Sequence, residues 1–246
     1  MDQGIWATWY DLPEGARDAH LAWLHGEYLP GLSQRPGFAW VAHYASQGGG
    51  TAMRHLRDSI VQHVTEDVPA GSQFLLLAGA ASANTFLAPS VLELEHNAAP
   101  SERAMLDQRQ AVRTAIFAEQ ARVNGPEFGA QTPGGTPAPA IQMGSFRAHS
   151  VEEEFDLGAW YAQYRLPHMA RMPGCIGARK LLCVAGWAKH AVLYEFTSLD
   201  ARLEHFEEKH EALGQDDASW SGRISRYTLH VPGSPTVAER TWPPRL

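Results

Sequence analysis

The chain lacks the features that mark several classes of protein. Only two of its 246 residues are cysteine, too few for a disulfide framework, so we expect a cytoplasmic protein. No apolar run approaches the ~20 residues that a membrane-spanning helix needs. The opening segment, MDQGIWATWYDLPEG, has an acidic second residue and no apolar core, unlike a secretory leader. We therefore expect no membrane partner.

Basic clusters and common catalytic motifs are also missing. Lys and Arg total 20 against 27 Asp and Glu, a net charge of −7, and no basic stripe forms, so no nucleic-acid partner is expected. G-x-S-x-G, P-loop, G-x-G-x-x-G and H-E-x-x-H motifs do not occur, and neither does a Cys/His cluster. We predict no cofactor and no metal. The hydrophobic content of 44% fits a globular protein with a core.

What the sequence does contain is an internal repeat. Trp23 to Gly37 reads WLHGEYLPGLSQRPG, and Trp160 to Gly174 reads WYAQYRLPHMARMPG. The copies align without a gap, and rare Trp, Pro and Gly residues coincide. Such a repeat indicates two related structural units in one chain.

The two copies have similar surroundings. Alternating apolar residues predict a strand before each copy, at 4–10 and 140–149, and helical periodicity follows at 15–34 and 154–171. Pro30 and Pro167 are expected to kink or end these helices. Strands are predicted next at 38–45 and 176–184. The second half continues with a strand at 190–196, a helix at 200–213 and a strand at 224–231.

The first half follows the same plan with additions. We expect an insertion at 48–72, a strand at 73–80 and helical segments near 84–96 and 101–124, with its fourth strand unidentified. The predicted organisation is a first unit at 1–124, a linker at 125–139, a second unit at 140–232 and an extended tail at 233–246. The fold class is α+β: two tandem ferredoxin-like βαββαβ units pair their bare sheet faces in an intrachain pseudo-dimeric α+β barrel.

The repeated motif also carries a family resemblance. Residues 155–181, FDLGAWYAQYRLPHMARMPGCIGARKL, followed by HAVLYEF, resemble the dimeric α+β barrel superfamily, and within it the EthD-like branch. The match covers nearly all of the second half but only the first strand, helix and second strand of the first half. It implies a pocket between the sheet and the helices of one unit. Activities in the superfamily include cofactor-independent monooxygenases, cyclases, dehydratases and decarboxylases, besides haem proteins.

One departure from the family bears on chemistry. The family helix commonly carries a Glu-His pair before Leu-Pro, whereas this chain has Glu27-Tyr28 in one copy and Tyr164-Arg165 in the other. Glu27 keeps the family position and could act as a base if burial raised its pKa, with Tyr28 as its hydrogen-bond partner. The alternative is a solvated polar face around Glu27 and a core-capping role for Tyr28.

Arg165 lies on the inward stripe of its helix, where a charge needs an acceptor. One interpretation is an anchor for an anionic ligand, with Arg147, His168 or Arg179 as helpers. The other is a structural ion pair with one of the glutamates at 152–154 or with Glu195.

Aromatic residues crowd the first strand pair. Trp9 and its neighbours either pack the core or line a pocket for a planar substrate. His43, which aligns with Lys180 of the second copy, is either a ligand contact or a histidine whose bonds are satisfied in the core or by solvent.

The sequence is compatible with three functions. The first is a cofactor-independent enzyme acting on an aromatic or anionic small molecule. The second is a non-catalytic barrel that binds a ligand or another subunit, including a homodimer of the two-unit chain. The third is a haem-binding barrel.

Overall fold

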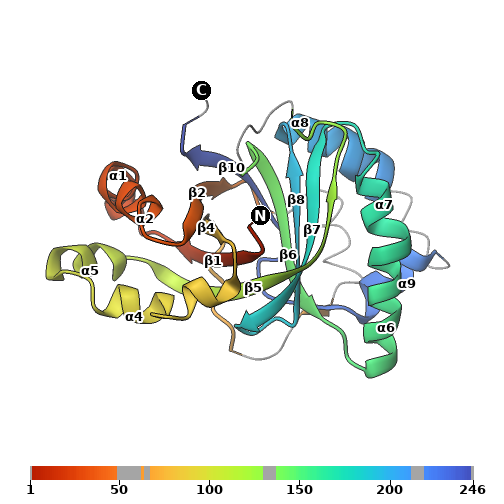
Figure 1. Cartoon of the computed structure of the whole chain (residues 1–246), viewed down its shortest axis with the longest axis horizontal. Coiled ribbons are helices and arrows are strands. Elements are labelled where there is room, and N and C mark those ends of the chain that lie inside the picture. The colour runs from red at the N-terminus through yellow and green to blue at the C-terminus, as the bar shows by residue number, and fades with distance from the viewer. Residues whose placement is uncertain (1, 49–61, 64–66, 130–136, 212–218, 245–246) are drawn as a thin grey trace.

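The structure, a computed structural model, describes residues 2–48, 62–63, 67–129, 137–211 and 219–244. Eight antiparallel strands close into a barrel with helices on its outside (Figure 1). The order around the barrel is β10-β2-β4-β1-β5-β7-β8-β6, and β6 pairs with β10 to close it. The barrel strands are β1 (Gly4–Asp11), β2 (Phe38–Ser46), β4 (Phe74–Ala80), β5 (Gln110–Asn124), β6 (Ala140–Arg147), β7 (Cys175–Ala185), β8 (His190–Phe196) and β10 (Thr236–Trp242).

Each half of the chain supplies four neighbouring strands. The first half contributes β2-β4-β1-β5, and the second contributes β7-β8-β6-β10. The halves therefore meet at two seams, β5 with β7 and β10 with β2. Two short strands, β3 (Gln62–His63) and β9 (Leu229–His230), extend the sheet beside β6.

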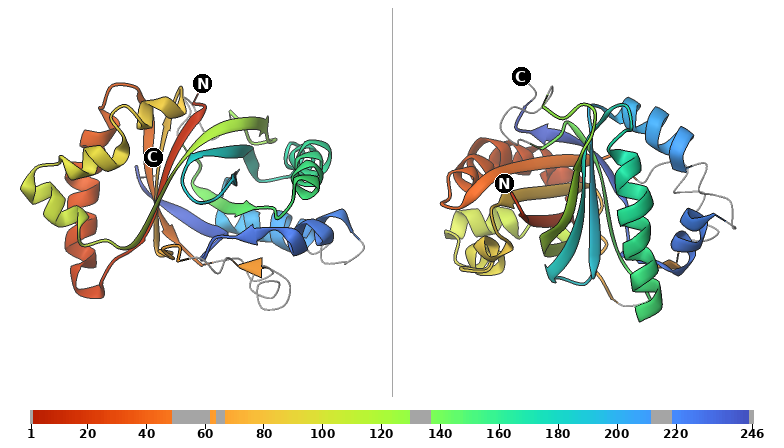
Figure 2. Two further views of the ribbon diagram at one scale, coloured as in Figure 1. Left: turned by 90° about the horizontal axis from the view of Figure 1, so that it is seen from below. Right: turned by 45° about the vertical axis from the view of Figure 1, so that its right-hand side comes forward.

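Helices cover the barrel on two opposite sides, one side for each half (Figure 2). The first half has α1 (Arg17–Trp23), α2 (Leu29–Ser33), α4 (Val91–His96), α5 (Pro100–Leu106) and the short 3₁₀ turns η1 (Glu14–Ala16) and η3 (Ala83–Phe86). The second half has α6 (Val151–Trp160), α7 (Leu166–Met169), α8 (Leu199–Ala201), the π-helical η5 (Arg202–Glu211) and α9 (Trp220–Tyr227).

The long helix of each half contains a π-helical segment at the same point of the repeat. These segments are η2 (Leu24–Tyr28) and η4 (Tyr161–Arg165), and each ends two residues before Pro30 or Pro167. Each proline lies in the first turn of the α-segment that follows, where its missing N–H costs little. The helices therefore continue for two or three residues past the prolines, and the regular α-helical hydrogen bonding is interrupted by the π segment just before each proline.

The buried apolar residues form an inner and an outer layer. One cluster lies in the barrel interior and includes Trp9, Tyr44 and Phe117. The others lie between the barrel wall and the helices, around Trp160 and Phe206 in the second half and around Trp6 and Phe86 in the first. Side chains alternate along each strand between the barrel interior and the side covered by helices, so both faces of the sheet are buried.

Two expectations for secondary structure were wrong. Residues 101–124 are helical only in α5, and the remainder is the 15-residue strand β5, the fourth strand of the first half. Residues 224–231 form the end of α9 and the short β9 rather than a barrel strand. The tail predicted to be extended includes the strand β10, which pairs with β2 and β6 and closes the barrel.

Parts of the predicted insertion (49–61 and 64–66) and of the predicted linker (130–136) lie outside the described residues. Within the described residues, no helix combines the length and the apolar character needed to cross a membrane.

Candidate functional site

The predicted site residues do not come together in one place. Glu27 and Tyr28 lie at the end of η2, outside the barrel, and Glu27 is exposed. Both border a surface groove of about 610 Å³ between α2 and the helices α4 and α5. Burial, followed by the nearby Glu95, raises the pKa of Tyr28, which makes it a still weaker base at neutral pH.

His43 is fully buried in a polar chain beneath the first-half helices. Its Nε2 lies 2.7 Å from the Tyr10 hydroxyl, and its Nδ1 lies 3.0 Å from His25 Nε2 and 2.9 Å from Thr241 Oγ1. Burial lowers its pKa well below the usual value, which keeps the ring neutral. These bonds favour the satisfied-core interpretation of His43.

Trp9 points into the barrel, where its Nε1 donates to Thr236 Oγ1 at 2.9 Å and the Arg113 guanidinium lies 3.9 Å from its ring. Arg147 lies over the Trp187 ring at 4.2 Å. His168 lies on the outer surface of α7 with Arg171, His205 and Lys209. Trp9, Arg147 and His168 do not line the pocket that contains Arg165.

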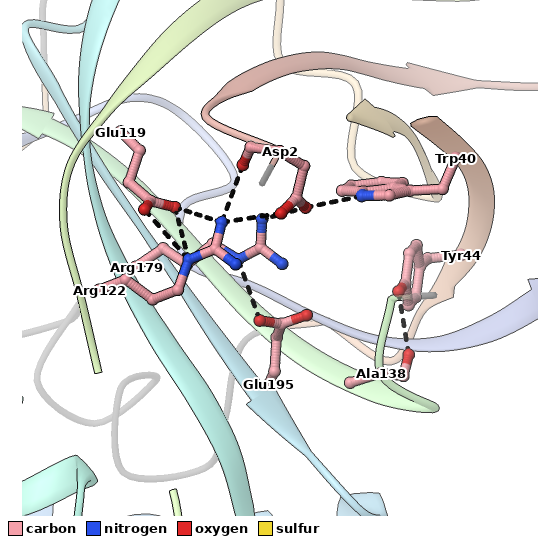
Figure 3. Close-up of polar contacts among 8 residues, drawn as sticks. All are labelled: Asp2, Trp40, Tyr44, Glu119, Arg122, Ala138, Arg179 and Glu195. Atoms are coloured by element: carbon pink, nitrogen blue, oxygen red, sulfur yellow. Dashed lines mark hydrogen bonds and ion pairs between the residues drawn. The ribbon is translucent and has the colours of Figure 1, made fainter. Parts of the chain in front are cut away.

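Arg179 belongs to an ion-pair network at one end of the barrel (Figure 3). Its Nη1 donates to Asp2 at 2.7 Å and its Nε donates to Glu195 at 3.1 Å. Asp2 also accepts from Arg122 and from the Trp40 indole. Burial opposes ionisation of Asp2, but Arg179 lowers its pKa to about 2. Arg179 thus has internal acceptors and is not available as a ligand anchor.

Arg165 is the one predicted residue that lines a pocket between the barrel wall and the second-half helices. It ends η4, and its guanidinium lies 4.6 Å from the Trp160 ring and 5.1 Å from the Phe206 ring. Only 8% of the residue is exposed. Glu195 and Glu154, the acceptors suggested by the sequence, bond instead to Arg179 and to His190 with Lys189.

The pocket floor is the outer face of β6 and β8. Gln142, Gly144 and Phe146 alternate along β6, and Val192 and Tyr194 lie beside them on β8. A Cβ added to Gly144 would meet Val192 at 3.5 Å and Phe146 at 3.8 Å, so its missing side chain leaves space there without backbone crowding. The free volume is about 80 Å³, roughly half a dozen water-sized spheres, or about one aromatic ring.

The pocket walls combine aromatic faces with a few polar groups. Leu157, Trp160 and Tyr161 come from the long helix, and Ser225, Thr228 and His230 come from α9 and β9. His230 Nε2 lies 3.2 Å from Thr228 Oγ1. Gln142 is oriented by Arg202, which donates to its side-chain oxygen at 2.8 and 2.6 Å.

Sequence reasoning missed Gln142, Gly144 and His230 as pocket residues. Gln142 and Gly144 interrupt an apolar strand on one face, a signal that could have been read as a polar floor. His230 was hidden because residues 224–231 were taken for one strand.

A buried lysine lies behind the pocket wall. Lys180, on β7, is 2% exposed, and its Nζ is 5.4 Å from the Phe146 ring and 5.0 Å from the Tyr161 ring. Burial lowers its pKa to about 7, so a large fraction is neutral at physiological pH. Nearby, His190 Nε2 lies 2.5 Å from Glu154.

The corresponding space in the first half is filled by side chains. Tyr10 packs against His43 and Phe74 beneath the helices, and Arg109 forms a bidentate pair with Glu95 at 3.0 and 2.7 Å. The two halves therefore differ where a ligand would bind, and of the two the second half holds the aromatic pocket.

Comparison with known proteins gives the fold. No family model matches the sequence, and no curated protein matches it. A "putative monooxygenase" from Fusobacterium nucleatum has a similar structure, with a TM-score of 0.55, 9% identity and coverage of 97% of this chain and 92% of that one. A "putative chlorite dismutase" aligns with a TM-score of 0.55, 12% identity and coverage of 98% and 96%.

An anthrone oxidase-like protein also matches, with a TM-score of 0.55, 10% identity and coverage of 98% and 91%. These identities are too low to assign an activity, but the coverage extends over both halves of the barrel. The chain therefore has the α+β barrel fold of the dimeric α+β barrel proteins.

Proposed function

We propose that this chain binds a small, single-ring aromatic molecule with an anionic group in the pocket beside Arg165. The observation that carries the proposal is the placement of a buried guanidinium at the edge of an aromatic pocket whose floor is left open by Gly144. Aromatic walls suit a planar ring, and a guanidinium suits a carboxylate. The names of the structural neighbours, which refer to monooxygenase and anthrone oxidase activities, support a small-molecule role for this fold.

Benzoate titration by calorimetry tests this proposal. Arg165→Met keeps the aliphatic stem but removes the charge, and we expect benzoate affinity to fall at least tenfold, about 1.4 kcal/mol, because a charged hydrogen bond is lost. Arg165→Lys, the matched control, should retain part of the affinity. No saturable binding by the wild-type chain, or equal affinity in Arg165→Met, would contradict the proposal.

A catalytic role is the second candidate, because His230 lines the same pocket and imidazole is the side chain best suited to proton transfer at neutral pH. We infer an enzyme that uses no cofactor, with His230 rather than the exposed Glu27 as the proton-transfer group. Oxygen uptake with a panel of hydroxybenzoates tests this candidate. His230→Gln should lose turnover while keeping benzoate affinity, whereas equal turnover would remove His230 from the mechanism.

Haem fits the pocket poorly as it stands. A free volume of about 80 Å³ is enough for one ring but not for a macrocycle of four. Haem binding would require the long helix to move away from the β6–β8 floor, and we therefore favour the single-ring ligand.

We further propose that the barrel consists of two tandem ferredoxin-like units, the first at 1–124 and the second starting at 140, of the EthD-like branch. The matching strand orders of the halves and the π segments at the same point of the repeat support a duplication. The branch rests on the motif at 155–181. We also propose that the protein is cytoplasmic and that two copies of the two-unit chain form a homodimer.

A further inference from the structure

A second polar feature lies inside the barrel, on the opposite face of the sheet from the aromatic pocket. Arg113 is the cross-strand partner of Trp9, and its neighbour on the same face, Ala115, belongs to the interior cluster with Trp9. The guanidinium lies 3.9 Å from the Trp9 ring, and 7% of the residue is exposed. Arg113 is therefore a cation directed into the barrel interior.

Arg113 has no acidic partner among the described residues. Its Nε and Nη2 are buried and make no hydrogen bond there. Other buried arginines do have acceptors: Arg179 bonds to Asp2 and Glu195, Arg109 bonds to Glu95, and Arg202 bonds to Glu207 and Gln142. Arg113 thus differs from these three arginines.

Deprotonation of the Arg113 guanidinium does not remove its buried charge at neutral pH. Burial lowers the pKa of Arg113 to about 10, so the group stays charged at neutral pH. Lys180 differs, because its pKa of about 7 lets it become neutral. A buried charge that persists without a partner is strongly unfavourable, and an anion from solution would supply the partner.

The two Arg113 nitrogens without hydrogen bonds also have a defined geometry. Nε–H and Nη2–H are the two parallel donors along one edge of a guanidinium, the edge that binds two oxygens of a carboxylate or phosphate. The ring of Trp9 supports the plane of the guanidinium at 3.9 Å and limits its rotation. The edge without hydrogen bonds is therefore the one that suits a bidentate oxyanion.

Two hydroxyl side chains lie at the same end of the barrel interior as Trp9 and Arg113. Thr236 Oγ1 accepts from Trp9 Nε1 at 2.9 Å, and Thr236 is the cross-strand partner of Met143. Ser145, two residues along β6 on the same face, is 1% exposed, and its Oγ makes no hydrogen bond with the described residues. Arg113 lies near the start of β5, whereas Glu119 and Arg122 lie toward its other end, so this site is remote from the network in Figure 3.

We propose that the Arg113 end of the barrel interior is an anion site, which binds the carboxylate or phosphate group of a small molecule through Nε and Nη2 of Arg113. The site is separate from the pocket at Arg165, because Arg113 faces inward from β5 and Arg165 lies on a helix outside the barrel. It does not depend on the proposed aromatic ligand.

Thermal unfolding of the full chain with inorganic phosphate or acetate, at constant ionic strength, tests the site. The wild-type Tm should rise with the logarithm of the anion concentration, by roughly 5–10 °C at about one hundred times Kd. Arg113→Met should abolish the rise. Arg113→Lys, which keeps the charge but lacks the two-donor edge, should weaken binding at least tenfold and carries the test if Arg113→Met does not fold.

A matched control variant shows whether the response to the anion depends on Arg113. Arg223→Met removes an exposed arginine and should leave the response unchanged. A response to phosphate alone assigns a phosphoryl ligand, and a response to acetate alone assigns a carboxylate. The proposal is overturned if neither anion raises the wild-type Tm or if Arg113→Met keeps the rise.

Discussion

Filling the floor of the aromatic pocket at Gly144 gives the sharpest test of where a ligand binds. An added Cβ would meet Val192 at 3.5 Å and Phe146 at 3.8 Å, which are ordinary contacts, so Gly144→Ala should fold normally. We expect that change to alter stability by less than about 1 kcal/mol. Gly144→Leu places three further carbons in a free volume of about 80 Å³, which leaves no room for a ring.

The expected effect of Gly144→Leu on binding is large. Benzoate affinity should fall at least 100-fold, about 2.8 kcal/mol at 1.4 kcal/mol per decade. Its stability should change little, because burial of the new side chain contributes about 1.5–3 kcal/mol and crowding costs about 1–3 kcal/mol. Calorimetric titration of the wild type, Gly144→Ala and Gly144→Leu, with urea unfolding of each, separates binding from folding. Affinity in Gly144→Leu within threefold of wild type would refute the assignment of this pocket.

Three other predictions concern buried charge and haem. Burial lowers the pKa of Lys180 in the folded protein to about 7, below its value in the unfolded chain, so the wild type should become more stable as the pH rises from 7 toward 10. Lys180→Met should be more stable than the wild type at pH 7. Equal pH profiles of the two proteins in urea unfolding would contradict this prediction. Asp2→Ala leaves Arg179 with one carboxylate fewer and should cost about 3 kcal/mol in urea unfolding, whereas a loss under 1 kcal/mol would show that the network is dispensable. Haem added to the purified chain should give no shifted Soret band, and a stoichiometric band would reverse our preference for a single-ring ligand.

Much of the fold could be predicted because periodicity and turn residues act locally. The strands around the two repeat copies fall within a few residues of their predicted positions, as β2 (Phe38–Ser46) and β8 (His190–Phe196) illustrate. Strand β5 was missed because its alanine, glutamine, glutamate and arginine residues favour a helix. Pairing with β1 and β7 overrides that preference, and such pairing depends on residues distant in the sequence.

The candidate site was predictable only in part, for a similar reason. The repeat correctly placed Arg165 on the inward side of a helix. The same alignment also made Glu27 and Tyr28 candidates, although added helices border that position in the first half. Which arginine has a carboxylate partner is likewise set by tertiary packing: Asp2 reaches Arg179 across 177 residues of sequence, a distance no local pattern spans.

The two seams between the halves have a thermodynamic consequence. Strand β5 of the first half pairs with β7 of the second, and β10 of the second pairs with β2 of the first, so backbone hydrogen bonds join the halves on both sides of the barrel. The halves must then unfold together as one cooperative unit. A destabilising change in the first half would reduce the amount of protein able to bind at Arg165, yet the affinity of each folded molecule would stay the same.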